Sequence, residues 1–503
     1  MNIKEYENKV RGCWLGKNIG GSLGAPFECR RGVFDVDFYT HDITQGVLPN
    51  DDLDLQLIFL NAAEKYGTML NSEILGEYWL SHIIANWSEY GAARNNMEMG
   101  LLPPFSGEYN NHNKNSCGSF IRSEIWACLT PGHPEKTVEL AYEDAIVDHA
   151  DEGVYAEIFC AAMLSAAFSE SDVNNLIDIG LSYIPAECDV AIAVKTVLDC
   201  YKNGDDWKAA RKKVLQVVPG TFGMYVGYED REPEDDIPLG EPGYDAPSNI
   251  GLTVLGLLYG EGDFSKSICL AVNCGEDADC TAGIVGSILG IIMGADKIPS
   301  KWIEPIGDEI KTVSIDTTDS DVKIPKTVSE LTQRVCTLMP TFMKGDCDIL
   351  SDDGVILSLR KDNMLYSQEI EKGLIQKIKF NDKLEKDRLG LAKSNSILSV
   401  VLNIKEGINI TDGVEKEFSL SIDNLIRKQQ WLTVKWHTPE EWTVIPAKTT
   451  CVNLDQAHGG TSLSEKKYKI IPNGVDKGRY DLLLEIRSNG RISTLFIPVT
   501  LFA

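Results

Sequence analysis

The spacing of hydrophobic positions changes once along the chain. Up to about residue 343, apolar residues recur at steps of three and four, the spacing that places them on one face of a helix. Beyond residues 344–346 the spacing shifts toward two, which is typical of strands with one buried face. Alanine-rich amphipathic helices are predicted at residues 154–168, 176–183, 191–203 and 207–218, and short strands at residues 355–359, 397–404, 418–422, 431–436, 480–486 and 491–499.

This change predicts a multidomain protein. We expect residues 1–343 to form an all-α domain and residues 344–503 to form an all-β accessory domain. Several short strands separated by turn signals indicate a β-sandwich, with space for a second small β unit ahead of it. The length of 503 residues agrees with more than one domain, and 43% hydrophobic residues suffice for sizeable cores.

An acidic segment lies between two stretches that have the pattern of buried helices. Residues 267–272 precede it, and residues 282–294, which follow it, are apolar around their whole circumference. The second stretch is too short to span a bilayer, which needs about 20 apolar residues. Its glycines recur at three- and four-residue steps and would let other helices approach closely. Glu276, Asp277 and Asp279 therefore lie against apolar flanks, a setting that requires a cation.

Asp277 and Asp279 are two residues apart in this segment. They would diverge on a regular helix, but both can turn toward one point in a loop that enters a helix. Oxygen ligands of this kind suit Mg²⁺, Mn²⁺ or Ca²⁺. The alternative is that the acidic residues only cap the helix and offset its dipole.

A second acidic cluster opens another predicted helix. It contains Asn50, Asp51, Asp52 and Asp54, more acidic groups than a helix cap needs. Adjacent carboxylates repel each other unless a cation or protons intervene. The two clusters could therefore share a two-metal site, and the sequence alone leaves open whether they meet.

Four stretches give the chain a resemblance to a known family. They are residues 12–20 with 24–28, the Asn50-Asp51-Asp52 motif, residues 118–122 with 144–149, and the motif at residues 275–280. In this order and spacing they resemble the ADP-ribosylglycohydrolases, also called the dinitrogenase-reductase-activating glycohydrolase family, over roughly residues 5–340. The resemblance implies an all-α domain of that type and a metal-dependent glycosidase that cleaves the bond at the anomeric carbon of a sugar.

The resemblance also implies a site for two Mg²⁺ ions, with Mn²⁺ as an alternative. Its ligands would be Asn50, Asp51, Asp52, Asp277, Asp279, Cys280 and Thr281. Asp52 and Asp277 would also take part in catalysis, and Glu28, in a predicted loop, would act as acid or base near the scissile bond. An ordinary surface carboxylate is the alternative for Glu28.

Four polar residues are candidates for substrate binding: Arg122, Asp148, His149 and Asn96. The first three lie in stretches that resemble those lining the family's substrate cleft. Asn96 belongs to an asparagine-rich region whose amides suit a sugar cleft and equally suit loops. His149 could instead be a structural residue, and Arg122 could simply pair with Glu143 or Glu124.

The chain departs from the family pattern at several positions. Lys17 replaces an acidic residue, Asn50 replaces a threonine, and Cys280 replaces the last hydroxyl ligand. Cys117-Gly118 occupies the place of an Asn-Gly pair. Because Mg²⁺ prefers hard oxygen ligands, either one metal site is altered or Thr281 compensates for Cys280. These departures bear on ADP-ribose as the substrate more than on the metal-dependent glycosidase chemistry.

The strand-rich region resembles, at residues 436–442, the immunoglobulin-like accessory modules of bacterial carbohydrate-active enzymes. Trp436 and Trp442 could bind sugar, although tryptophans of a sandwich more often pack in its core. Such a module favours a small glycoside or nucleoside-like conjugate over a protein side chain as the substrate. It could equally mediate a homo-oligomer.

Composition excludes several classes of partner. A formal net charge of −27 disfavours nucleic acid and anionic membranes. Residues 1–9 lack the apolar run of a signal peptide, and 13 scattered cysteines suit the reduced thiols of a cytoplasmic protein. The sequence has no P-loop and no Gly-x-Gly-x-x-Gly motif after a strand. The acidic residues 228–236 are either a solvated loop or a border of the cleft.

The leading prediction is Mg²⁺-dependent hydrolysis of an N- or O-glycosidic bond in an ADP-ribosyl or related small-molecule sugar substrate. One alternative is a glycosidase that acts on an unrelated bacterial or plant carbohydrate. Another is a catalytically silent protein that binds ADP-ribose or a sugar, which Lys17 and Cys280 make credible.

Overall fold

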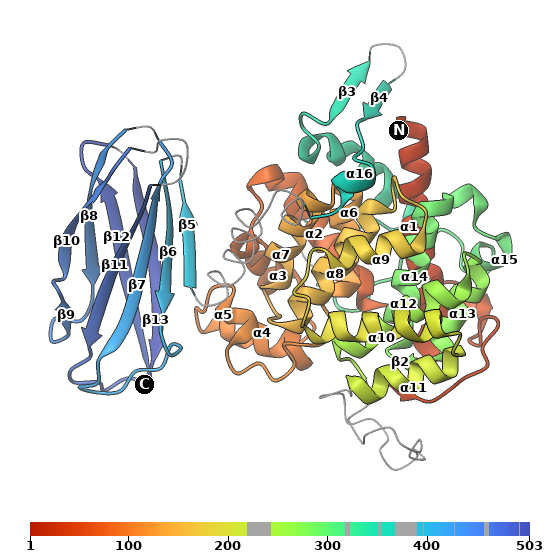
Figure 1. Cartoon of the computed structure of the whole chain (residues 1–503), viewed down its shortest axis with the longest axis horizontal. Coiled ribbons are helices and arrows are strands. Elements are labelled where there is room, and N and C mark those ends of the chain that lie inside the picture. Colours follow the sequence, from red (N-terminus) through yellow and green to blue (C-terminus); the bar gives the residue numbers. More distant parts are fainter. Residues whose placement is uncertain are drawn as a thin grey trace. The chain divides into compact units, whose positions relative to one another are not determined.

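The structure is a computed structural model that describes residues 1–218, 243–316, 322–350, 354–367, 390–395, 397–426, 428–456, 462–491 and 493–503. The chain divides into two compact units, Met1–Gly373 and Leu374–Ala503 (Figure 1). The first unit is helical and the second consists of strands, as the hydrophobic spacing predicted. The acidic residues 228–236 lie outside the described part of the chain.

Two helices that run in opposite directions form the centre of the helical unit (Figure 1). They are α1 (Ile3–Gly24) and α14 (Ala278–Met293). Glycines let their backbones touch: a Cβ on Gly16 would lie 2.0 Å from the Gly286 carbonyl oxygen, and a Cβ on Gly290 would lie 2.0 Å from the Gly12 carbonyl oxygen. The glycines that recur in residues 282–294 therefore form the surface through which α14 contacts α1.

The remaining helices pack around this pair. They are α2 (Asp54–Tyr66), α3 (Ser72–His82), α4 (Ser88–Glu98), α5 (Phe105–Glu108), α6 (Glu124–Leu129), α7 (Pro134–Ala145), α8 (Glu152–Ala166), α9 (Val173–Leu181), α10 (Asp189–Asn203), α11 (Trp207–Val217), α12 (Ala246–Gly260), α13 (Phe264–Asn273), α15 (Ser300–Ile303) and α16 (Val328–Phe342). All four helices predicted from alanine-rich runs are present, as α8 to α11. None of the described helices is long and apolar enough to cross a membrane.

Local sequence signals set the helix ends next to the two acidic clusters. Asp263 caps α13 by accepting a hydrogen bond from the Lys266 amide. The chain then turns at Gly275, whose φ of +72° suits glycine. It forms the short strand β2 (Gly275–Glu276), which pairs with β1 (Arg30–Arg31), before α14 begins. This pairing ties the start of the acidic segment to the segment that carries Glu28.

The helical unit also includes a hairpin, β3 (Cys347–Leu350) with β4 (Gly354–Leu357). The hairpin follows residue 343, where the sequence placed the end of the first domain. It stays with the helices because the Leu357 amide donates to the Met1 carbonyl and the N-terminal amine donates to the Leu357 carbonyl. The boundary between the two compact units therefore lies after Gly373, later in the chain than the change in hydrophobic spacing at residues 344–346.

The second unit is a sandwich of two antiparallel sheets (Figure 1). One sheet has the order β10-β8-β12-β13, and the other has the order β5-β6-β7-β11-β9. The strands of the two sheets are β5 (Gly390–Ser394), β6 (Leu398–Ile404), β7 (Lys416–Asn424), β8 (Gln430–His437), β9 (Thr443–Ile445), β10 (Thr449–Leu454), β11 (Ser462–Ile471), β12 (Arg479–Ser488) and β13 (Thr494–Phe502).

Burial alternates along the strands of the sandwich, as on β8. Trp436 and Trp442 are 1% and 2% exposed and pack in its core, so they present no sugar-binding surface. Trp436 contacts the rings of Phe418 and Tyr468. The core role that the sequence favoured for these tryptophans is confirmed.

The glycine contact between α1 and α14 makes a prediction about stability. Gly16→Ala should destabilise the helical unit by about 3 kcal/mol or more, because its Cβ would collide with backbone that cannot rotate away. This cost exceeds the gain of about 1 kcal/mol that alanine brings to a helix. Denaturant unfolding followed by circular dichroism would measure it, with Lys4→Ala on an exposed position of α1 as the control. Equal stability of the two variants would contradict the contact.

Candidate functional site

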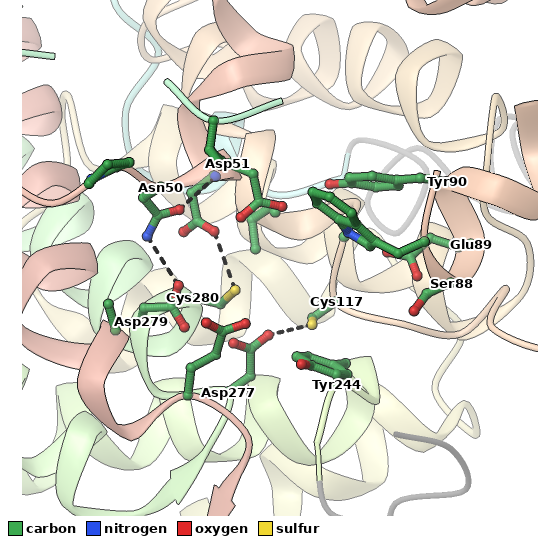
Figure 2. A pocket seen from close by; sticks show the side chains of 18 residues that line it. Asn50, Asp51, Ser88, Glu89, Tyr90, Cys117, Tyr244, Asp277, Asp279 and Cys280 are labelled. Carbon is green, nitrogen blue, oxygen red and sulfur yellow. Dashed lines mark hydrogen bonds between the residues drawn. The ribbon is translucent and has the colours of Figure 1, made fainter. Parts of the chain in front are cut away.

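The two acidic clusters of the sequence meet in one pocket of the helical unit, of about 400 Å³ (Figure 2). Asn50 donates a hydrogen bond of 3.0 Å to Asp279 Oδ2, and Cys280 Sγ lies 3.4 Å from Asp52 Oδ1. The lining residues are Ala25, Glu28, Pro49, Asn50, Asp51, Asp52, Trp87, Ser88, Glu89, Tyr90, Cys117, Gly118, Ile121, Tyr244, Asp277, Asp279, Cys280 and Val313.

The elements that carry these residues begin or end at the pocket. Asn50 caps the short helix at residues 51–53 by accepting from the Asp52 amide, and α2 follows directly. Asp277 precedes the first turn of α14, and Asp279 lies within it. Acidic groups at helix N-termini are favourable because the helix dipole is positive there. Gly24 completes the arrangement, because a Cβ on it would lie 2.4 Å from the Asp279 backbone.

Not every carboxylate of the two clusters points into the pocket. Glu276 is buried and forms an ion pair with Arg31, at 2.7 Å between Oε1 and Nε. Asp54 accepts hydrogen bonds from the amides of Val313 and Ser314. These two acidic residues are therefore structural.

Three groups of side chains could hold a metal ion among the described residues. Each group brings one ligand atom from each of its members to within 4.8 Å of the others. The groups are Glu28, Asp277 and Asp279; Asp52, Asp279 and Cys280; and Cys117, Asp277 and Cys280. Only the first consists of oxygen ligands alone. Cys117, known from the sequence only as a departure, donates to Asp277 Oδ2 (Figure 2).

Burial and mutual repulsion raise the pKa values of the pocket carboxyls. Burial and Asp52 raise the pKa of Asp279 to about 6. Burial, followed by repulsion from Asp279, holds the pKa of Asp277 well above its ordinary value, and burial with Asp52 does the same for Asp51. Glu28, exposed at the pocket mouth, has its pKa raised to about 9, first by Asp279 and then by desolvation.

A divalent cation fits this environment. Asp277 Oδ1 and Asp279 Oδ1 are buried and have no hydrogen-bond partner among the described residues. Buried charged oxygens normally have partners, so these two are available as ligands. A cation would compensate both the unpartnered oxygens and the repulsion that raises the carboxyl pKa values.

The side chain of Lys17 places a positive charge at the site. Lys17 of α1 is 2% exposed, and its Nζ lies 2.8 Å from Asp52 Oδ2 and 3.3 Å from Glu124 Oε1. Burial alone would lower the pKa of Lys17, but the neighbouring carboxylates outweigh it and raise that pKa. The sequence identified Lys17 as a departure from the family pattern but not its partner.

The four predicted substrate-binding residues lie behind the pocket wall rather than in its lining. Arg122 and Asp148 are fully buried and pair with each other, and Arg122 also pairs with Asp144 at 2.7 Å. The predicted partners of Arg122, Glu143 and Glu124, are not the ones it uses. The sequence did not reveal Asp144 and Asp148 as the partners of Arg122. They are 22 and 26 residues away from it along the chain and come into contact with it only after folding.

His149 and Asn96 are also held by internal bonds. His149 Nδ1 lies 2.9 Å from Asp148 Oδ1, and its Nε2 lies 2.8 Å from the Ser116 hydroxyl. The Asn96 amide donates to the carbonyls of Ser106 and Tyr109. Direct substrate contact by these residues stays a prediction. His149 lies against the pocket wall, because its Nε2 is 4.0 Å from Glu89 Oε1.

Thr281 as the replacement for the missing hydroxyl ligand stays a prediction, and in the structure its side chain has a partner of its own. Its hydroxyl is buried and donates to the Ala278 carbonyl at 3.2 Å. Thr281 is also absent from the residues that line the pocket. The side chains that face the pocket from this turn of α14 are Asp279 and Cys280 (Figure 2).

Sequence reasoning missed an aromatic rim on the pocket. Trp87 is 45% exposed, although tryptophan usually buries most of its surface. Its ring stacks near that of Tyr90, at 6.2 Å between centroids, and Tyr244 lines the pocket next to Cys117 (Figure 2). The sequence signal was Trp87 directly before a helix start, followed by Ser88, Glu89 and Tyr90.

Comparisons of sequence and structure relate this chain to known proteins. A search of curated proteins found no match. One similar solved structure is an ADP-ribosylglycohydrolase-related protein complex, with 18% sequence identity, a TM-score of 0.43, and coverage of 67% of this chain and 98% of that chain. Another is a Pseudomonas fluorescens alkylpurine DNA glycosylase, AlkC, bound to DNA containing an abasic site analog, with 10% identity, a TM-score of 0.15, and coverage of 91% of this chain and 100% of that chain.

The comparison with protein families matches residues 2–335 to ADP-ribosylglycohydrolase. This match spans most of the helical unit, including every residue of both acidic clusters. The chain therefore belongs to the ADP-ribosylglycohydrolase family.

Proposed function

We propose that the protein is a Mg²⁺-dependent glycosidase that hydrolyses an N- or O-glycosidic bond in an ADP-ribosyl or related sugar substrate. Mn²⁺ is the alternative ion. The observation that carries the proposal is the pair of buried oxygens on Asp277 and Asp279, which have no hydrogen-bond partner in the described part of the chain and line the same pocket as Glu28. Membership in a glycohydrolase family supports the same reaction class.

The acidic residues would hold the metal and the sugar. Asp277 and Asp279 offer free oxygens, and Asp51 lines the same wall, half-buried. Bound there, a divalent cation would orient the sugar hydroxyls and lower the pKa of a water. The Asn50 carbonyl already accepts from the Asp52 amide, so Asn50 mainly positions Asp52 and Asp279.

Glu28 would supply the proton for the leaving group. Glycosidases cleave through a transition state of oxocarbenium character, and a carboxyl that keeps its proton can protonate the departing atom. The negative charge of Asp279 raises the pKa of Glu28 and so favours the protonated form. Glu28 lies at the pocket mouth, where a leaving group would exit.

The aromatic rim would bind the leaving group or the sugar face. Trp87, which stacks on the buried ring of Tyr90, offers a flat apolar surface that suits a planar base or the apolar face of a sugar. Such a surface favours a small-molecule conjugate with at least one ring.

We also propose a cytoplasmic protein. Cys13, Cys128 and Cys160 are buried in the helical core and form no disulfide bond. Free buried thiols persist most readily in a reducing compartment. A homo-oligomer formed through the sandwich stays a prediction.

A second candidate function is binding of ADP-ribose or a sugar without turnover. The pairing of Lys17 with Asp52 favours it, because it engages one carboxylate that the reaction would use. A panel of ADP-ribosyl peptides, ADP-ribosyl nucleosides and unrelated bacterial or plant glycosides, tested for both binding and product, separates the two functions. Binding without product from any of them would favour the silent protein.

Asp277→Asn should reduce hydrolysis by about a thousandfold or more and weaken metal binding, because it removes a charged ligand. The fold should change little, since Asp277 makes no helix-capping bond. Product formation and isothermal titration with Mg²⁺ would measure both effects. Asp263→Asn is the matched control, because asparagine caps a helix as well as aspartate does. Normal turnover in the Asp277 variant would reject the proposed site.

Glu28→Gln should lower kcat by about a hundredfold to ten-thousandfold, the usual contribution of a general acid. Glutamine keeps the size of the side chain but cannot give up a proton. Activated substrates, whose leaving groups need no proton, should lose far less. A comparison of aryl glycosides with good and poor leaving groups would measure this, and equal losses for both would exclude the acid role.

The free energy of unfolding of the metal-free protein should fall as the pH rises. An acid whose pKa is raised by folding stabilises the folded state fully below its unfolded pKa, about 4, and this contribution is lost as the pH passes the folded pKa. For Asp279 that window ends at about 6, and for Glu28 at about 9. Thermal unfolding in excess chelator would show the decline.

Added Mg²⁺ should therefore raise the melting temperature more at about pH 8 than at about pH 5, where protons already neutralise part of the cluster. The Asp277→Asn variant should show a smaller difference between the two pH values. A metal-induced shift that is the same at both would show that the acidic cluster is not the binding site.

A further inference from the structure

The ammonium of Lys17 is built into the acidic site rather than placed beside it. Lys17 lies on the face of α1 that contacts α14, where its neighbour Gly16 allows the backbones to touch. A Cβ on Gly283 would lie 3.1 Å from Lys17 Cδ, so the glycine of α14 leaves the space through which the lysine stem passes. The packing of both helices thus directs this cation to Asp52.

Three oxygen atoms, from two ion pairs and one hydrogen bond, surround the ammonium of Lys17. An ammonium has three N–H donors. Lys17 Nζ lies 2.8 Å from Asp52 Oδ2, 3.3 Å from Glu124 Oε1 and 2.8 Å from the Ile121 carbonyl oxygen. All four residues border or underlie the pocket, and Lys17, Asp52 and Glu124 are nearly or fully buried.

Glu124 is in turn fixed by its own partners. The Gln56 amide donates to Glu124 Oε2 at 3.0 Å, and the Ser287 hydroxyl donates to Glu124 Oε1 at 3.0 Å. Fully satisfied buried networks of this kind hold one geometry. The ammonium therefore has a prepared position beside Asp52, with two carboxylates to balance its charge.

This position conflicts with a second metal ion at Asp52. A divalent cation there would lie next to the positive charge of Lys17 and would have to share Asp52 with it. The remaining atoms of that candidate group come from Asp279 and from Cys280, whose sulfur is a poor ligand for Mg²⁺. The group formed by Glu28, Asp277 and Asp279 lacks both obstacles.

We propose that this chain binds a single divalent cation, through the unpartnered oxygens of Asp277 and Asp279 beside Glu28, and that Lys17 supplies the second positive charge of the site. The inference rests on the proposed metal-dependent function, and it differs from the two ions that the family resemblance implies. Lys17 is a positioning residue: it holds Asp52 in place and balances its charge without touching the reacting atoms.

The number of ions per chain tests this inference. The wild-type protein, stripped with chelator and titrated with Mn²⁺ and with Mg²⁺, should bind one ion, and electron paramagnetic resonance should show an isolated Mn²⁺ signal. Two ions with a spin-coupled signal would overturn the inference and leave the proposed function standing. Saturable binding of neither ion would overturn the proposed function as well.

Lys17→Met tests the role of the charge, because methionine keeps an apolar stem of similar length without the ammonium. The variant should melt at a lower temperature without metal, since Asp52 and Glu124 lose their cation. It should bind a second ion, and saturating Mn²⁺ should recover most of the lost melting temperature.

Lys9→Met is the matched control on the same helix, because Lys9 also donates to a buried carbonyl, that of Ile291, but lies away from the pocket. This control should bind one ion. If Lys17→Met also bound one ion with unchanged affinity, Lys17 would not be what excludes the second. If Lys17→Met failed to fold even with metal, the ion count of the wild-type protein would still decide the inference.

Discussion

The backbone contact between α1 and α14 is the constraint on which the rest of the helical unit depends. Glycines on both helices bring the main chains together at Gly12 with Gly290 and at Gly16 with Gly286, and Gly24 brings the end of α1 against Asp279. No other residue could occupy these positions without pushing the helices apart, because even a methyl group would overlap backbone atoms. The same contact sets where Lys17 and the loop that carries Glu28 emerge, so the packing of two helices defines the geometry of the pocket.

Around this contact the protein concentrates more negative charge than its own cations balance. Lys17 compensates Asp52 and Glu124, and Arg31 compensates Glu276, while Asp277 and Asp279 keep oxygens with no partner among the described residues. Elsewhere in this unit carboxylates are paired, as Asp144 and Asp148 are with Arg122, although the buried carboxyl of Glu157 has no hydrogen-bond partner among the described residues. In the pocket, unpartnered oxygens of Asp277 and Asp279 lie close together. This clustering identifies the site on physical grounds, because neighbouring uncompensated charges are costly and persist where a ligand compensates them.

Local patterns in the sequence were sufficient for much of this picture. The shift in hydrophobic spacing separated helices from strands, and excess acidic residues at two helix starts marked Asp51, Asp277 and Asp279 as site residues. Partnerships between distant residues were not accessible in the same way. Arg122 was expected to pair with Glu143 or Glu124, and it pairs with Asp144 and Asp148 instead, because the ion pair depends on how helices turn against each other. The exposure of Trp87 and the burial of Trp436 depend likewise on which neighbours cover them.

The sequence by itself determined the secondary structure of most segments, the family and the chemical character of the site, because helix caps, residue spacing and the clustering of carboxylates are properties of short stretches of chain. Tertiary structure decided which charges find partners. Lys17 and Asp52 are distant in sequence, and no pattern of residues near either one predicts their contact. Whether an acidic residue is a metal ligand, a salt-bridge partner or a helix cap depends on the charges and apolar surface that surround it, and only the folded chain brings those surroundings together.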